Sequence, residues 1–158
     1  MIFKKIKIII EEGFFKAMEL EDDINGVAYP MDGEIFVREP RGDVILHELI
    51  HMLEDDSNTR KGIVRLFDDT HIKPLDELLE EDNFVEKWED ILEGYPKEDF
   101  VSEIYAYDLV EGLLDIFNND SKEAIGFLRW FVEDITGVYI QLEFKTLDIE
   151  VLNIEDEV

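Results

Sequence analysis

The sequence predicts a single domain of the α+β class, with a small, mainly antiparallel sheet in its N-terminal part and several helices after it. Three observations lead to this prediction. The chain has 158 residues, of which 46% are hydrophobic, so it can bury one core but leaves little room for two. β-favouring runs of strand length occur within residues 2–39, and the later segments carry apolar residues mainly at helical spacing. We therefore expect one domain over 1–158.

The N-terminal part contains the strand signals. Residues 2–10 alternate weakly and are rich in isoleucine, which predicts a strand, although a helix through 10–20 is equally compatible with the apolar residues there. Two more β-favouring runs, at 26–30 and 34–39, are separated by a short turn that contains Gly33. This pattern is typical of a β-hairpin.

The rest of the chain is mainly helical in its pattern. Asp43 is a good N-cap for an amphipathic helix from about 44 to 54. Residues 55–73 show no clear period and predict a loop with room for one strand. Asp120 begins a capping box and Gly137 is a typical stop signal for the helix between them. The remaining elements that we expect are helices over 74–93, 97–118 and 121–136, and one or two strands over 138–154.

Composition limits the class of protein. Cysteine is absent, which excludes disulfides and thiolate nucleophiles and leaves nitrogen and oxygen ligands for any metal. Lysines and apolar residues begin the chain, but Glu11 and Glu12 end the apolar run before it reaches the length of a signal peptide or a membrane helix. These features predict an intracellular, cytoplasmic protein with no membrane partner.

The net charge limits the class of partner. It is −26, from 41 acidic and 15 basic residues. Such a surface repels nucleic-acid phosphates and anionic lipids, so nucleic acid is not an expected partner. It favours encounter with basic peptides, basic proteins and divalent cations. The same acidity also fits simpler roles in solubility or in adaptation to salt or heat.

Residues 47–51 read His-Glu-Leu-Ile-His, and they carry the strongest functional signal. On a helix, His47 and His51 lie on one face a turn apart, so both imidazoles can bind one metal ion at about 2 Å. Glu48 lies beside them and can take a proton from a metal-bound water, then pass it to the leaving amine of a peptide bond. The chain contains only three histidines, so this spacing is hard to attribute to chance.

A third metal ligand is expected downstream, because a catalytic zinc site usually has three protein ligands and one open position. Glu103 is the first candidate, since it lies on the apolar face of the expected 97–118 helix, where an unpaired carboxylate is costly. His71 is the alternative. It follows His51 by twenty positions, in a stretch that has the composition of an exposed turn.

The pentad, followed by SEIYAYDL at 102–109, resembles the gluzincin branch of the zincin metallopeptidases. The likeness covers about 26–118. It is also similar to the minimal single-domain gluzincins, to the catalytic domain of the anthrax toxin lethal factor and to small repressor-cleaving peptidases of mobile elements. The resemblance implies a zincin-like fold, a bound Zn²⁺, the metal ligands His47, His51 and Glu103, and Glu48 as the general base.

The resemblance also implies a substrate and its binding mode. The substrate would be a peptide or protein, basic by the charge argument, that pairs along residues 34–39 as an edge strand. Thermolysin-like members have an aspartate four residues after the glutamate ligand, where this chain has Tyr107, and Asp108 comes one residue late. Tyr107 shares the helix face of Glu103, and either stabilises the developing oxyanion or packs as a core tyrosine.

Two other hypotheses stay open. A zincin-fold protein can bind zinc without turnover, either as an interaction module or as a latent enzyme whose 138–154 segment lies over the cleft. A structural protein with a coincidental pentad would bind no metal.

Overall fold

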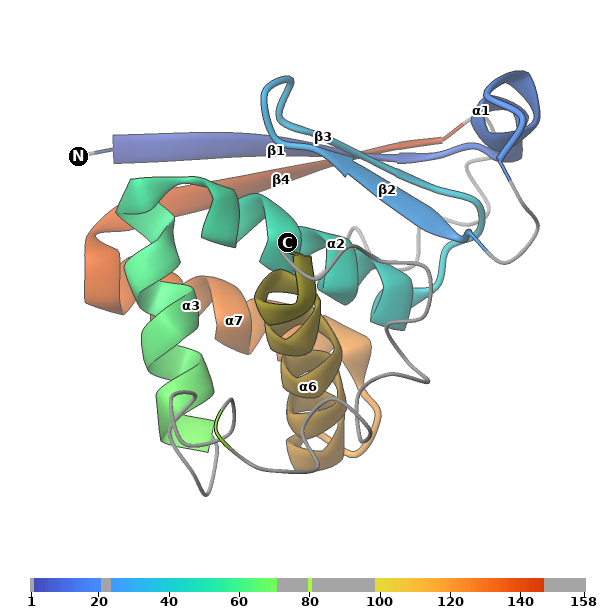
Figure 1. The fold of residues 1–158 in the computed structure, drawn as a ribbon. Coiled ribbons are helices and arrows are strands. Elements are labelled where there is room, and N and C mark those ends of the chain that lie inside the picture. Colours follow the sequence, from blue (N-terminus) through green and yellow to red (C-terminus); the bar gives the residue numbers. More distant parts are fainter. Residues whose placement is uncertain (1, 21–23, 71–79, 81–98, 147–158) are drawn as a thin grey trace.

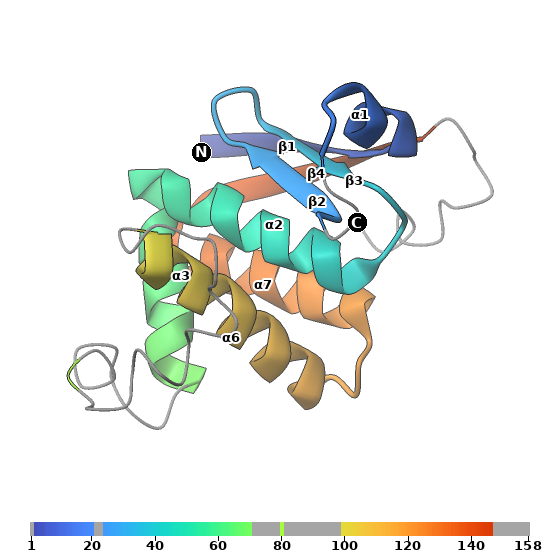
Figure 2. The ribbon, with the colours of Figure 1, turned by 45° about the vertical axis from the view of Figure 1, so that its right-hand side comes forward.

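The computed structural model describes residues 2–20, 24–70, 80 and 99–146 of the chain (Figure 1). Within these residues the protein is a mixed α+β structure with one four-stranded sheet and five helices. In chain order the elements are β1 Ile2–Ile10, α1 Glu12–Ala17, β2 Gly26–Tyr29, β3 Glu34–Val37, α2 Gly42–Asp55, α3 Ser57–Thr70, α6 Phe100–Ile116, α7 Ser121–Thr136 and β4 Val138–Thr146. The sheet forms one layer, and α2, α3, α6 and α7 lie on one side of it, with α2 and α7 packed against the strands (Figures 1 and 2).

The sheet is mainly parallel, so the prediction of a mainly antiparallel sheet is wrong. The strand order is β2-β3-β1-β4, in which β1 is parallel to both β3 and β4, and the β2–β3 hairpin is antiparallel. β4 comes from the end of the described chain and pairs with β1 from Ile2 with Val138 to Ile10 with Thr146. A residue pattern indicates a strand but not the direction of its neighbour. Parallel neighbours need a crossover connection: α1 and β2 lie between β1 and β3 in the chain, and α2, α3, α6 and α7 lie between β3 and β4.

The core lies between the sheet and the four helices. Ile6, Ile8 and Ile10 of β1 alternate along the strand, face the helices and are buried. On the opposite face of the sheet, Phe14 of α1 stacks on Phe36 of β3, with ring centroids 4.0 Å apart. The short helix α1 therefore covers the side of the sheet that faces away from the main core (Figure 2).

α2 lies at the centre of the helical layer and contains the pentad. It contacts β2 and β3 of the sheet as well as α3, α6 and α7. The helix begins at Gly42, so Asp43 lies inside its first turn and the prediction that Asp43 is the N-cap is wrong. Arg41 occupies the N-cap position, with its guanidinium 2.7 Å from the Asp43 carboxylate. The buried side chains of α2 are Ile45, Leu46, Glu48, Leu49, Ile50, Met52 and Leu53.

The loop predicted over 55–73 is wrong, because most of this range forms α3. Asp56 caps the start of the helix, since its carboxylate accepts a hydrogen bond of 2.8 Å from the backbone N–H of Asn58 in the first turn. The buried apolar side chains of α3 recur at helical spacing: Ile63, Leu66 and Phe67. The charged residues around this short apolar run concealed its helical period.

The other predicted elements agree with the structure within the described residues. β1 confirms the strand over 2–10, and β2 and β3 confirm the hairpin. α6 and α7 confirm the two later helices. Asp120 accepts a hydrogen bond of 3.2 Å from the Glu123 N–H, and Gly137 has the left-handed φ of 73° that ends α7.

Some predictions lie outside the described residues. These are the helix over 74–93, apart from residue 80, which is helical, the strand after residue 146, and His71. Among the residues that the structure describes, no helix combines the length and the apolar character needed to cross a membrane.

Two helical glycines allow the packing of α3 on α7 to be tested. A Cβ at Gly62 of α3 would lie 3.0 Å from the Cα of Val132 on α7, whereas a Cβ at Gly126 of α7 would meet no atom within 4 Å. Alanine improves helix propensity at both positions, but at Gly62 the backbone contact opposes this gain. We expect Gly126→Ala to raise the free energy of unfolding by about 0.5–1 kcal/mol. Gly62→Ala should lower the free energy of unfolding by about 1–3 kcal/mol. Urea denaturation measures both variants, and equal effects of the two substitutions would contradict the close packing of α3 on α7.

Candidate metal centre

α2 brings the two histidines of the pentad together at one end of a buried cluster. The Nε2 atoms of His47 and His51 lie 3.2 Å apart, and the two side chains are 18% and 17% exposed. The possible ligand atoms of His47, Glu48 and His51 all lie within 4.8 Å of one another. This group of nitrogen and oxygen donors can bind a metal ion.

α6 adds Glu103 from across the interface with α2. Its Oε1 lies 3.1 Å from His51 Nε2, and its Oε2 lies 3.4 Å from His47 Nε2. The residue is 8% exposed, because Ile104 and Ala106 beside it pack in the core and fix this face of α6 against α2. The structure therefore places Glu103 against both histidines, as a third ligand requires.

The separations of these donor atoms fit a tetrahedral zinc ion. Donors about 2.0–2.1 Å from tetrahedral zinc lie about 3.3 Å from one another. The nitrogen–nitrogen distance here is 3.2 Å, and the two nitrogen–oxygen distances, each to a different oxygen of Glu103, are 3.1 and 3.4 Å. In addition, Glu48 Oε2 and Glu103 Oε2 are buried and accept no hydrogen bond from the described part of the chain. Buried carboxylate oxygens without hydrogen bonds beside two imidazoles are suited to bind a divalent cation.

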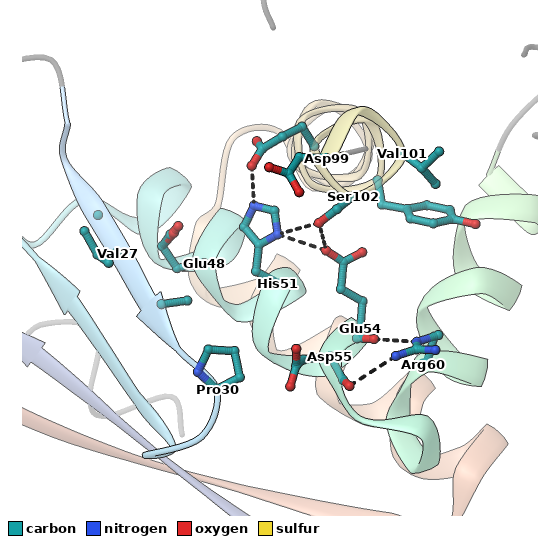
Figure 3. Close-up of a pocket in the computed structure, with 14 residues that line it drawn as sticks. Val27, Pro30, Glu48, His51, Glu54, Asp55, Arg60, Asp99, Val101 and Ser102 are labelled. Atoms are coloured by element: carbon teal, nitrogen blue, oxygen red, sulfur yellow. Dashed lines mark hydrogen bonds and ion pairs between the residues drawn. The ribbon is translucent and has the colours of Figure 1, made fainter. Parts of the chain in front are cut away.

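Glu48 lies between His51 and β2 (Figure 3). Gly26 of β2 permits the close approach of helix and strand, because a Cβ there would lie 2.9 Å from Glu48 Cγ. Glu48 is 7% exposed, and this burial raises its pKa; the charges of His51 and His47 oppose the rise, and the charge of Glu103 adds to it. A carboxyl group with a raised pKa is suited to accept a proton and to return it near neutral pH.

Glu103 and His51 form an ion pair in the absence of a metal. Burial by itself lowers the pKa of His51, but hydrogen bonds to Glu103 and Glu54 and the charges of Glu103 and Glu48 raise it to about 10. Burial raises the pKa of Glu103, but the His47 and His51 imidazoles lower it to about 2. A cation bound between these groups would replace the His51 proton as the partner of Glu103.

Tyr107 contacts the site through its ring. It lies beside His47, with ring centroids 4.6 Å apart, and is partly buried against the core. This contact helps to hold the His47 imidazole, whereas the catalytic role of Tyr107 stays a prediction. Tyr105 lies on another face of α6, packs edge-on against Phe67 of α3 with ring centroids 4.7 Å apart, and is one of the residues that line the adjoining pocket.

An open pocket of about 640 Å³ adjoins the cluster (Figure 3). Gly26, Val27 and Ala28 of β2 line one side, and Glu48 and His51 of α2 line its floor. Residues 34–39, predicted to be the edge strand of the site, contain β3, which lies between β2 and β1. The prediction is wrong because the hairpin pattern does not specify which of its two strands is outermost. β2 is the edge strand beside the pocket.

Two polar residues at the site had no role in the sequence analysis. His51 Nδ1 lies 2.9 Å from Glu54 Oε1 and 3.1 Å from Ser102 Oγ, and the Ser102 hydroxyl donates to the same Glu54 oxygen. Glu54 follows His51 by three residues and so shares its helix face, and Ser102 directly precedes Glu103. The sequence could have indicated Glu54 and Ser102 by this closeness to the candidate ligands His51 and Glu103.

Comparison of the chain with protein-family models, with curated proteins and with solved structures gave no match. A mixed α+β fold by itself supports many chemistries. The function must therefore be argued from the geometry of the site.

The raised pKa of His51 predicts how the stability of the zinc-free protein depends on pH. A raised pKa in the folded state means that the stabilisation is fully present below the ordinary value of 6.5 and is lost as the pH rises through about 10. We expect the free energy of unfolding to fall between pH 6.5 and pH 10. Urea denaturation at several pH values should show that the variant His51→Gln lacks most of this fall in the free energy of unfolding. An imidazole pKa of His51 at or below 6.5 in an NMR titration would contradict the prediction.

Proposed function

We propose that the protein is a zinc-dependent peptidase of the gluzincin type, in which His47, His51 and Glu103 bind zinc and Glu48 is the general base. The observation that carries this proposal is the spacing of the three donors, 3.1 to 3.4 Å, beside a buried carboxylate and an open pocket. Three protein ligands leave one position of a tetrahedral zinc for water or substrate, as in catalytic sites. The resemblance of the pentad and of residues 102–109 to the gluzincins supports the same assignment.

Glu103 fits the role of third ligand better than Glu48 does. Glu48 is adjacent to His47 in the helix, but its carboxylate is directed toward β2 (Figure 3). Glu103 comes from a separate helix, and its two oxygens contact both Nε2 atoms. His71 lies outside the described residues. With Glu103 as the third ligand, the carboxylate of Glu48 is available for proton transfer.

Zinc, when bound, supplies a Lewis acid that polarises a carbonyl group and makes a water molecule more acidic. Glu48 takes one proton from the attacking water as the carbon–oxygen bond forms. It then gives this proton to the amide nitrogen as the carbon–nitrogen bond breaks, so the products are a carboxylic acid and an amine. Burial favours the protonated form of Glu48, and the nearby imidazoles favour the ionised form that the first step needs.

The substrate that fits this pocket is an extended, basic peptide. β2 has no further strand on its outer side among the described residues, so its backbone can pair with a peptide strand. The acidic residues that line the pocket are Glu48, Glu54, Asp55, Asp99 and Glu103. Arg60 also lines it, but its guanidinium donates to the backbone carbonyls of Glu54 and Asp55. The remaining negative charge favours substrates with lysine or arginine near the cleaved bond.

The metal content of variants tests the ligand set. We expect about one zinc per chain in the wild type, as one closed set of ligands predicts. His51→Ala and Glu103→Ala should lose the metal, and His71→Ala should keep it. Elemental analysis measures the zinc, and circular dichroism controls for folding. Loss of zinc in His71→Ala but not in Glu103→Ala would identify His71 as the third ligand, and a zinc-free wild type would contradict the proposed function.

The variant Glu48→Gln tests the general base. It keeps the size of the side chain but cannot accept the proton, so activity should fall by about 10²–10⁴-fold while zinc stays bound. Cleavage of unstructured lysine-rich peptides, followed by mass spectrometry, is the measurement. Glu111→Gln, at an exposed position of α6, is the matched control. Equal activity of Glu48→Gln and this control would exclude Glu48 as the base.

A zinc-binding protein without turnover is the second candidate. It is favoured by the position of the ligands on two helices, because a metal there would link α2 to α6 and stabilise the fold without catalysis. In this case the wild type would be fully loaded with zinc but inactive. A latent form covered by 138–154 is not supported for residues 138–146, because β4 lies at the sheet edge opposite to β2.

A further inference from the structure

The carboxylate of Glu54 is held in a single position beside His51. Glu54 Oε1 lies 2.9 Å from His51 Nδ1, and the Ser102 hydroxyl donates to the same oxygen (Figure 3). The Glu54 side chain is only 12% exposed. Arg60 does not compete for it, since the Arg60 guanidinium donates to the backbone carbonyl of Glu54. The contacts of the Glu54 carboxylate described here are therefore to His51 and Ser102.

These contacts determine which nitrogen keeps its proton when His51 is neutral. An ionised carboxylate only accepts hydrogen bonds, so the proton between His51 and Glu54 is on Nδ1. Nε2 is then the nitrogen that faces Glu103, at 3.1 Å, and His47, at 3.2 Å. Without its proton, Nε2 has a lone pair directed at the candidate metal position. A carboxylate on the far nitrogen also makes an imidazole a stronger metal ligand.

The same contacts connect the two helices that supply the ligands. Glu54 lies on α2 and follows His51, whereas Ser102 lies on α6 and precedes Glu103. The hydrogen bond between Ser102 and Glu54 thus joins α2 to α6 one residue away from the Glu103 ligand. A buried carboxylate is tolerated when it is hydrogen-bonded, and here two donors from different helices satisfy it.

We propose that Glu54 is a positioning residue for the metal site, which fixes the ring and the tautomer of His51 and, through Ser102, the distance between His51 and Glu103. This inference rests on the proposed zinc site. Glu54 is not one of the three proposed metal ligands, and its contacts are to His51 and Ser102. Its effect is on metal affinity and on the geometry around the metal.

The decisive comparison is between Glu54→Gln and Glu111→Gln. Both variants remove one negative charge without a change in size, but only Glu54 contacts His51, and Glu111 is exposed on α6. We expect the zinc Kd, measured by competition with a chelator, to rise about tenfold in Glu54→Gln and up to about 100-fold in Glu54→Ala. Ser102→Ala should give a smaller rise, and Glu111→Gln should match the wild type.

Two further measurements separate positioning from a merely structural role. The visible absorption of the Co²⁺-substituted protein should change in Glu54→Gln, because the ligand geometry changes, and should not change in Glu111→Gln. Urea denaturation of the zinc-free proteins shows any general loss of stability. If Glu54→Gln has the zinc Kd and Co²⁺ spectrum of Glu111→Gln while the wild type binds zinc, this proposal is overturned and the zinc site stands. A wild type that binds no zinc overturns the proposed function and this proposal with it.

Discussion

The packing of α6 against α2 is the contact on which the site depends. It brings the Glu103 carboxylate to 3.1 and 3.4 Å from two imidazole nitrogens, with Glu48 buried beside the same histidines. Burying an ionised carboxylate costs on the order of several kcal/mol of folding free energy unless a positive charge compensates it, as mutations at buried ion pairs show. In the zinc-free protein this charge is the proton of His51, whose pKa is about 10. A divalent cation would supply the same compensation with more charge.

α2 also relates the metal centre to the sheet. α2 contacts β2 and α6 at the same time, so this one helix positions the candidate ligands relative to β2. Gly26 allows β2, the outermost strand on this side of the sheet among the described residues, to approach Glu48 closely. Glu54, Asp55 and Asp99 place part of the chain's acidity at this pocket. A peptide bound along β2 would therefore meet both the charge and the chemistry of the site.

The elements that were predicted correctly are those with strong local signals. α7 is bounded by the side chain of Asp120 and by the positive φ of Gly137, both of which are readable from neighbouring residues. α3 was missed because Ile63, Leu66 and Phe67 give it only a short apolar stripe among charges, and burial against α2 and α7 stabilises it. The sheet direction was wrong because β4 pairs with a strand that begins the chain, and such a pairing leaves no local pattern.

The sequence by itself determined the pentad: helical geometry alone places His47 and His51 on one face with Glu48 beside them. It also indicated Glu103, because a carboxylate on an apolar helix face requires a partner. Only the tertiary structure decided that Glu103 meets both histidines, that β2 rather than β3 is the strand beside the pocket, and that Glu54 and Ser102 hold His51. The physical reason is the distance along the chain over which each interaction acts. Helix periodicity and capping act within a few residues, whereas donor distances and hydrogen bonds between α2 and α6 depend on how elements about fifty residues apart pack together.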